Sequence, residues 1–233
     1  MWDRQIPELS RHWRVLRYDL PGHGGSHALP AASVSELADR MVATLDQLGV
    51  DRFGYAGCSI GAAVGAELAL RYPHRLGSLA LVAASPRFAD ADSFRQRAAT
   101  VRGSGLDRSP GPRRSGGSPG VRRRPARHRR LGRPDGPHHR PACYIAACEA
   151  LAAFDVRAEL GAITMPTLVL VGADDQVTPA ADARVLVQGI RDARLALVPG
   201  ASHLAPSSNP RPSRTCWCGT SPPPGSPRTT PPA

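Results

Sequence analysis

The residues best suited to chemistry form a short glycine-flanked motif, Gly57-Cys58-Ser59-Ile60-Gly61. The apolar run at 52–56 predicts a strand before the motif, and the small residues at 62–72 predict a helix after it. A serine on a sharp strand-to-helix turn projects its hydroxyl clear of the sheet, and flanking glycines admit the strained backbone. The motif therefore predicts that Ser59 is a nucleophile. The alternative is a serine that only caps the following helix.

Two further residues complete a candidate triad in the chain order serine, acid, histidine. The apolar, β-branched run at 167–171 predicts a buried strand, and Asp174 and Asp175 follow its end. Acids just past the carboxyl end of a parallel strand lie where α/β sheets bind ligands, and Asp175 is our first choice. Another short strand is predicted at 194–198. His203 follows it in a glycine-containing loop, where we expect it to act as a general base.

Strand and helix patterns alternate along the chain, which predicts an α/β fold with a doubly wound, mostly parallel sheet. Further strands are predicted at 13–18 and 79–84, and further helices at 33–48 and 180–190. Ser33 and Glu36 have the spacing of a capping box at the start of the first of these helices. His23 lies in a glycine-rich turn, where we expect a surface position rather than a place in the pocket.

Taken together, these motifs resemble the α/β-hydrolase superfamily and, more narrowly, the 3-oxoadipate enol-lactonases. The resemblance covers residues 1–102 and 144–206. It includes the serine motif, the run Arg17-Tyr18-Asp19-Leu20-Pro21-Gly22-His23-Gly24-Gly25-Ser26, and the loops that carry the acid and the histidine. The triad motifs belong to the whole superfamily, whereas the lactonase assignment depends on the sequence around them.

The resemblance implies an α/β-hydrolase fold with Ser59, Asp175 and His203 as the catalytic triad. It also implies that the backbone N–H of Ile60 lies in the oxyanion hole, and that 3-oxoadipate enol-lactone is hydrolysed through an acyl-enzyme in aromatic-compound catabolism. A small-molecule lactone or ester is the expected substrate, with no metal or organic cofactor. Other esterases and hydrolases of C–C bonds stay open as alternatives, because the residues alone indicate only ester-like hydrolysis.

The same resemblance predicts that the sheet is incomplete at the N-terminus. Family members begin with further strands and with a His-Gly loop that supplies one oxyanion-hole N–H, and Met1 corresponds to a point after that loop. Ile60 would then supply the remaining donor. The loss of one donor typically lowers turnover by about 100- to 1,000-fold, so an inactive fragment is a further alternative.

Basic charge is concentrated in two segments of unusual composition. All 30 basic residues are Arg, and the formal net charge is +11. Residues 104–142 hold 11 Arg against two Asp, a net charge of +9, and residues 207–233 add three Arg and no acid. The remainder of the chain therefore carries about −1. Both segments are rich in Pro, Gly and Ser and contain too little apolar surface to form a core.

We therefore predict two parts of a hydrolase core at 1–103 and 143–206. They are separated by a disordered or irregular segment at 104–142, where the related lactonases have a lid, and followed by a disordered tail at 207–233. Out-of-frame translation of GC-rich DNA would produce such segments. The alternative for 104–142 is an arm that binds nucleic acid. That segment has no aromatic residues for base stacking, so we expect no specific nucleic-acid partner.

Five cysteines lie at spacings that do not match a zinc site, and their number is odd. This pattern predicts reduced thiols in a cytoplasmic protein, with Cys58 as a small buried residue. No signal peptide is predicted, and no apolar run is long enough to span a membrane. The sequence leaves the oligomeric state open.

Overall fold

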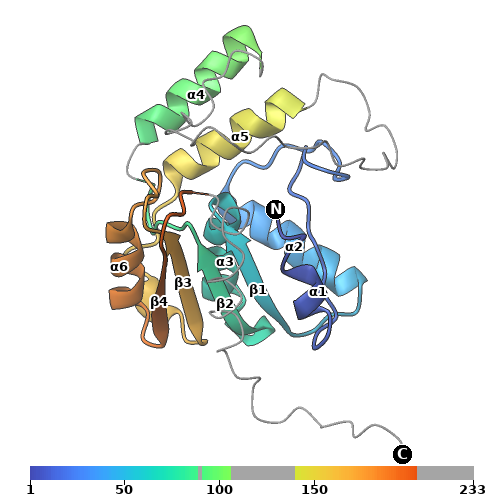
Figure 1. Cartoon of the computed structure of the whole chain (residues 1–233). Coiled ribbons are helices and arrows are strands. Elements are labelled where there is room, and N and C mark those ends of the chain that lie inside the picture. The colour runs from blue at the N-terminus through green and yellow to red at the C-terminus, as the bar shows by residue number, and fades with distance from the viewer. Residues whose placement is uncertain (89–90, 106–139, 204–233) are drawn as a thin grey trace, which may run out of the picture.

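The computed structural model describes residues 1–88, 91–105 and 140–203. In chain order its elements are α1 (Ile6–Leu9), α2 (Val34–Gln47), β1 (Phe53–Cys58), α3 (Ile60–Arg71), η1 (Pro73–Arg75), β2 (Leu76–Val82), α4 (Ala91–Ser104), α5 (Arg140–Ala153), η3 (Leu160–Ala162), β3 (Thr167–Gly172), α6 (Ala180–Gly189) and β4 (Ala193–Val198). A sheet lies at the centre, and helices α4 and α5 lie side by side above the carboxyl ends of its strands (Figure 1).

Four parallel strands form the sheet in the order β1-β2-β3-β4. The strands end in register, since Cys58 lies opposite Val82 and Gly172 lies opposite Val198. Because all four strands run in one direction, their carboxyl ends share one edge of the sheet. The residues that follow β1, β3 and β4 therefore come together at that edge.

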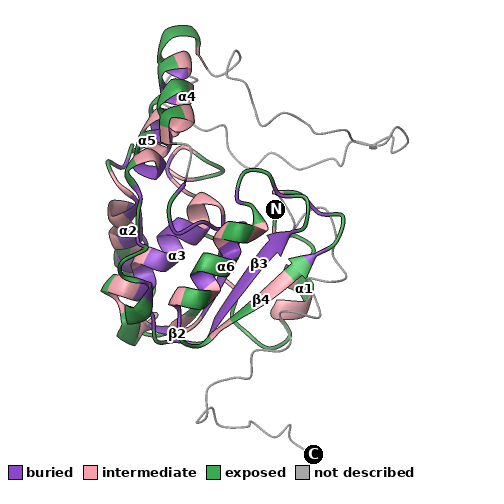
Figure 2. Cartoon of the chain, turned by 90° about the vertical axis from the view of Figure 1, so that its left-hand side faces the viewer, coloured by how far each residue is buried: buried purple, intermediate pink, exposed green. Residues whose placement is uncertain are grey.

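Strand β3 is buried on both faces, as its continuous apolar run predicts. Every residue of β3 is buried. Helices α2, α3 and α6 lie on one side of the sheet, and the short helix α1 lies on the other (Figure 2). The main core forms on the first side, whereas a smaller cluster on the second side contacts Trp2 and consists of Cys58, Val82, Ala83, Leu170, Val198 and Ala201. Helices therefore lie on both faces of a parallel sheet, which is the predicted fold class.

Helix α2 begins as its sequence predicts. The Ser33 hydroxyl accepts a hydrogen bond from the Glu36 N–H at 3.1 Å, which satisfies one free amide of the first turn. The Glu36 carboxylate reaches one residue further back than a capping box requires and accepts from the Ala32 N–H at 2.7 Å. The apolar face that includes Leu37 and Met41 is buried in the main core.

The strand predicted at 13–18 is wrong. Residues 14–20 have no regular secondary structure. The side chains of Trp13 and Leu16 are 53% and 45% exposed. An apolar run becomes a strand only when a neighbouring strand takes its backbone hydrogen bonds, and no described residue pairs with this segment.

Helices occupy both ends of the predicted irregular segment 104–142. Helix α4 ends at Ser104 and helix α5 begins at Arg140. The part of the segment at 106–139 lies outside the described residues, and so does the predicted tail at 207–233. The prediction of an irregular lid and the alternative of a nucleic-acid-binding arm both fall there.

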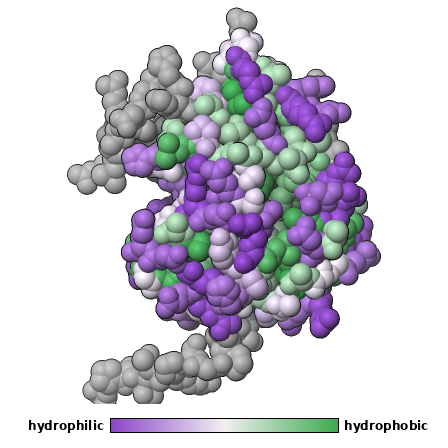
Figure 3. All heavy atoms as spheres, turned by 180° about the vertical axis from the view of Figure 1, so that it is seen from behind, coloured by the Kyte–Doolittle hydropathy of each residue, from purple (hydrophilic) through white to green (hydrophobic). Residues whose placement is uncertain are grey.

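The surface of the described residues is mixed in character. Polar side chains dominate the face shown in Figure 3, and apolar side chains reach it in smaller areas between them. None of the described helices combines the length and the apolar character that a membrane crossing requires.

Candidate active site

Ser59 lies at the turn between β1 and α3 in a strained backbone conformation, with φ of 57° and ψ of −119°. A positive φ in a residue other than glycine costs on the order of 1–3 kcal/mol and persists only where the surroundings enforce it. Here the Ser59 N–H donates to the Val82 carbonyl at 2.9 Å, and the Ser59 carbonyl accepts from the Ala62 N–H at 2.8 Å. The hydroxyl makes no capping bond to α3, so the alternative of a serine that only caps the helix is wrong.

The two glycines of the motif face different surroundings. A Cβ atom at Gly57 would lie 2.1 Å from the Gly61 carbonyl oxygen, so the turn closes only around a residue without a side chain. A Cβ atom at Gly61 would meet only the Tyr55 hydroxyl within 4 Å, at 3.8 Å, which is an ordinary contact. The tight turn therefore requires glycine before the serine and tolerates a methyl group after it.

This difference predicts opposite outcomes for two matched substitutions. We expect Gly57→Ala to push the first turn of α3 away and to lower ester hydrolysis at least about 100-fold, the loss typical of a 1 Å misplacement. Gly61→Ala should retain activity within a few-fold. Initial rates with a 4-nitrophenyl ester and thermal unfolding of both variants provide the measurement. Equal losses in the two variants would contradict this account of the turn.

The structure brings the three predicted triad residues together. The His203 Nε2 atom lies 2.9 Å from the Ser59 Oγ atom. On the other side of the ring, His203 Nδ1 lies 3.0 Å from Asp175 Oδ2 and 3.2 Å from Oδ1. Asp174, the second choice of acid, is exposed to solvent. The arrangement is that of a nucleophile, a base and an acid that orients the base.

Asp175 is buried, with a side chain that is 0% exposed. Its Oδ1 atom accepts from the N–H groups of Val177 and Thr178 at 2.9 and 3.0 Å, and its Oδ2 atom accepts from the Thr178 hydroxyl at 2.8 Å. Burial alone would raise the pKa of Asp175, but the hydrogen bonds from His203 and Thr178 outweigh it and lower the pKa below its usual range. The carboxylate is thus held ionised beside the imidazole.

Thr178 has a role that the sequence analysis did not assign. It is fully buried and contacts both the acid and the histidine, since its hydroxyl lies 3.3 Å from His203 Nδ1. The signal in the sequence is the spacing Asp-x-x-Thr, in which an aspartate side chain binds backbone and hydroxyl groups two and three residues further along.

The loop that carries His203 is fixed against the end of β3. A Cβ atom at Gly172 would lie 2.2 Å from the Ala201 carbonyl oxygen, so strand and loop are in close backbone contact. The Cys58 thiol donates to the His203 carbonyl at 3.9 Å. Burial, with a smaller contribution from the charge of Asp175, raises the pKa of this thiol to about 12. Cys58 is therefore a neutral packing residue, as predicted.

Ile60 is the first residue of α3 and directly follows the serine. Amide groups in the first turn of a helix have no acceptor within that helix. The Ile60 N–H therefore remains the candidate oxyanion-hole donor, and Ile60 also lines the adjoining pocket.

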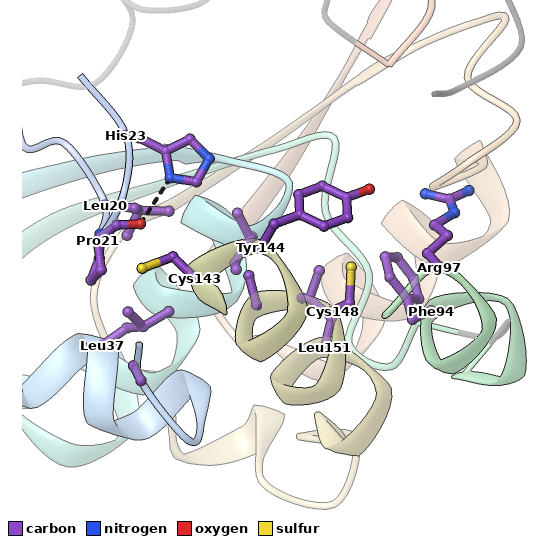
Figure 4. A pocket seen from close by; sticks show the side chains of 13 residues that line it. Leu20, Pro21, His23, Leu37, Phe94, Arg97, Cys143, Tyr144, Cys148 and Leu151 are labelled. Carbon is purple, nitrogen blue, oxygen red and sulfur yellow. Dashed lines mark hydrogen bonds between the residues drawn. The ribbon is translucent and has the colours of Figure 1, made fainter. Parts of the chain in front are cut away.

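A pocket of about 180 Å³ extends from Ile60 to the helices above the sheet. Its wall is mostly apolar, and the residues that line it are Leu20, Pro21, His23, Ala31, Leu37, Ile60, Phe94, Arg97, Cys143, Tyr144, Ala147, Cys148 and Leu151. Figure 4 shows His23 at this wall, with Nδ1 3.0 Å from the Pro21 carbonyl oxygen. His23 is exposed in the turn, as expected, and its side chain also borders the pocket.

Within the described part of the chain, Cys58, Cys143 and Cys148 are free and buried. Burial raises the pKa of the two pocket thiols, Cys143 and Cys148. Across the same residues, no group of three or more His, Cys, Asp or Glu side chains is placed to hold a metal ion.

Known hydrolases are similar to this chain in sequence and in structure. The sequence pattern of the family described as "alpha/beta hydrolase fold" matches residues 1–210. 3-Oxoadipate enol-lactonase 2 of Acinetobacter baylyi is 30% identical, over 91% of this chain and 79% of the relative. Pimeloyl-[acyl-carrier protein] methyl ester esterase of Nitrosomonas europaea is 31% identical, over 93% and 88%. The crystal structure of the enol-lactonase from Burkholderia xenovorans LB400 is similar with a TM-score of 0.74 and 25% identity, over 93% of this chain and 83% of that one.

Proposed function

The chain belongs to the α/β-hydrolase family, and we propose that it is a serine hydrolase that opens the ring of 3-oxoadipate enol-lactone. The observation that carries the proposal is the continuous hydrogen-bonded path from Ser59 through His203 to the buried Asp175. The choice of an enol-lactone is supported by the similarity to two enol-lactonases and by the mostly apolar pocket beside the serine. We place the reaction in the cytoplasm, in the catabolism of aromatic compounds.

In the first half of the reaction, the Ser59 oxygen attacks the lactone carbonyl carbon while His203 Nε2 takes the serine proton. Negative charge develops on the carbonyl oxygen, and the Ile60 N–H is the donor that we assign to it. The ring C–O bond then breaks. The departing enol oxygen takes the proton from His203, and the enol tautomerises to the ketone. Asp175 holds the imidazole in the required tautomer and stabilises its cation throughout.

In the second half, a water molecule attacks the acyl-enzyme carbonyl carbon and gives its proton to His203 Nε2. The bond to the Ser59 oxygen breaks, and that oxygen takes the proton back from His203. The acid is released and the enzyme returns to its starting state. His203 therefore acts alternately as base and acid, so the ring must stay free to reach either oxygen.

A second candidate is the hydrolysis of a simple carboxylic ester. It is favoured by the similarity to the methyl ester esterase, which has about the same identity as the enol-lactonase. The same three residues would act in the same order, and the leaving group would be an alcohol rather than an enol. Substrate choice, not chemistry, separates the two candidates.

A substrate panel tests the proposal. The purified chain is incubated with 3-oxoadipate enol-lactone, with a methyl ester of similar size and with a 4-nitrophenyl ester, and product formation is followed by chromatography. The proposal predicts the highest kcat/KM for the enol-lactone. A higher value for the methyl ester would favour the esterase candidate. No hydrolysis of any substrate would contradict both candidates.

A further inference from the structure

Arg97 stands apart from the other arginines of helix α4. Arg95 pairs with Asp92 at 2.7 Å and Arg102 pairs with Glu149 at 2.6 Å. Among the described residues, no carboxylate lies within salt-bridge distance of Arg97. Its guanidinium instead stacks over the Phe94 ring, 5.2 Å from the ring centre, and is half-buried.

This guanidinium lines the same pocket as Ile60, the residue next to the nucleophile. It is the one charged group among the described lining residues, because the remaining lining is apolar apart from the His23 ring, the Tyr144 hydroxyl and two neutral thiols. A charge in apolar surroundings is costly unless it is paired. The pocket therefore carries one positive charge whose partner is not supplied by the described protein.

Tyr144 lies at the same end of the pocket. Tyr144, Cys148 and Arg97 line the pocket together. Burial raises the pKa of the Cys148 thiol, and Tyr144 and the charge of Arg97 act in the opposite direction. Figure 4 shows the Tyr144 hydroxyl directed toward the side on which Arg97 lies. A hydroxyl donor and a guanidinium fork thus occupy the end of the pocket formed by α4 and α5.

We propose that Arg97, assisted by Tyr144, binds a carboxylate of the substrate at the end of the pocket remote from the reacting carbonyl. The substrate class is then an ester or lactone that carries a free carboxylate at a distance from the scissile bond. The inference rests on the proposed function for the position of the reacting end at Ser59.

The chemistry of the guanidinium fits this role. Its planar fork can donate two parallel N–H bonds to one carboxylate, and such charge-assisted pairs are about twice as strong as neutral hydrogen bonds. Stacking on Phe94 limits the rotation of the fork, so less side-chain entropy is lost on binding. A neutral chain end would leave the guanidinium unpaired, so the pocket should discriminate between acidic and neutral substrates.

The rival interpretation is that Arg97 only packs on Phe94 and faces solvent. The two interpretations predict different relative rates of hydrolysis for two substrates of equal length. These are the 4-nitrophenyl monoester of glutarate and 4-nitrophenyl valerate. The two esters share the leaving group and the chain length. The glutarate ester ends in a carboxylate, whereas the valerate ester ends in a methyl group. The ratio of their kcat/KM values isolates the contribution of the carboxylate.

For the wild-type protein we expect a ratio of kcat/KM values that favours the glutarate ester. We expect Arg97→Gln to lower this ratio by about tenfold, because the variant loses a hydrogen bond to a charged group. Arg95→Gln is the matched control, since it removes the same charge two residues away on an exposed side chain paired with Asp92, and the ratio should not change. An unchanged ratio in Arg97→Gln, or equal changes in both variants, would overturn the inference.

A binding measurement separates failure of this inference from failure of the proposed function. Calorimetry on the Ser59→Ala variant compares monomethyl glutarate with dimethyl glutarate, and requires no turnover. Carboxylate recognition is supported if Ser59→Ala binds the monoester more tightly than the diester and if Ser59→Ala/Arg97→Gln does not. This result would support the inference even if no ester is hydrolysed. Equal binding of the two compounds overturns it even if hydrolysis is observed.

Discussion

Replacing Ser59 by alanine should reduce ester hydrolysis to the background rate, a loss on the order of a million-fold in kcat. The Ser59 Oγ atom lies 2.9 Å from the base, at the start of the hydrogen-bonded path to Asp175, and alanine removes that atom alone. The backbone of the turn is held by hydrogen bonds to the main chain, so the variant should keep its fold. Initial rates with a 4-nitrophenyl ester, together with circular dichroism, provide the measurement.

Ser202→Ala is the matched control for this loss. Ser202 is exposed and directly precedes His203, so its substitution tests whether any change near the histidine lowers the rate. We expect this variant to retain activity within a few-fold. A folded Ser59→Ala variant that keeps more than about a tenth of the wild-type rate would contradict the assignment of the nucleophile.

Asp175→Asn should lower kcat by about 10,000-fold while leaving the fold in place. The carboxylate accepts the Nδ1–H of His203 at 3.0 Å and carries the charge that balances the imidazolium. An amide has almost the same shape but removes the charge and can donate to Nδ1, which favours the wrong tautomer of the ring. Steady-state kinetics with the same 4-nitrophenyl ester, supported by a thermal unfolding curve, measure the effect.

Asp174→Asn is the matched control for Asp175→Asn. Asp174 is exposed and is adjacent in sequence, so Asp174→Asn makes the same chemical change outside the hydrogen-bonded path. It should leave kcat within a few-fold of the wild-type value. Similar losses in both variants, with both folded, would contradict the assignment of Asp175 as the acid.

The sheet and the three triad positions could be predicted from the sequence because their signals are local. The run at 167–171 is wholly apolar, so it predicts a strand that is buried on both faces, and β3 has that character. The loop after each parallel strand must lie at one edge of the sheet. Ser59, Asp175 and His203 could therefore be placed together although 144 residues separate the first from the last.

Other features depend on contacts between distant residues, and the sequence did not reveal them. Helix α4 has only a sparse apolar face, with Ala98 and Val101 buried against α5, so its pattern is weak without that partner. The pocket position of Arg97 depends on the same packing. The error at 13–18 has the opposite cause, since an apolar run there lacks a neighbouring strand among the described residues.

The apolar spacing within helix α4 contains a signal that could have been used. Phe94, Ala98 and Val101 follow one another at intervals of four and three residues, which is the period of a helix with one buried face. Arg97 lies beside this face rather than opposite it. The side on which it emerges becomes clear only when Tyr144 and Cys148 of α5 are placed against α4.

Covalent labelling shows whether His203 activates Ser59 as a nucleophile. The folded chain is incubated with a fluorophosphonate, which reacts with activated serines, and the labelled peptide is identified by mass spectrometry. We expect a single phosphonyl group on Ser59 that is absent from Ser59→Ala and strongly reduced in Asp175→Asn. A folded protein that stays unlabelled, or that is labelled at another residue, would contradict it.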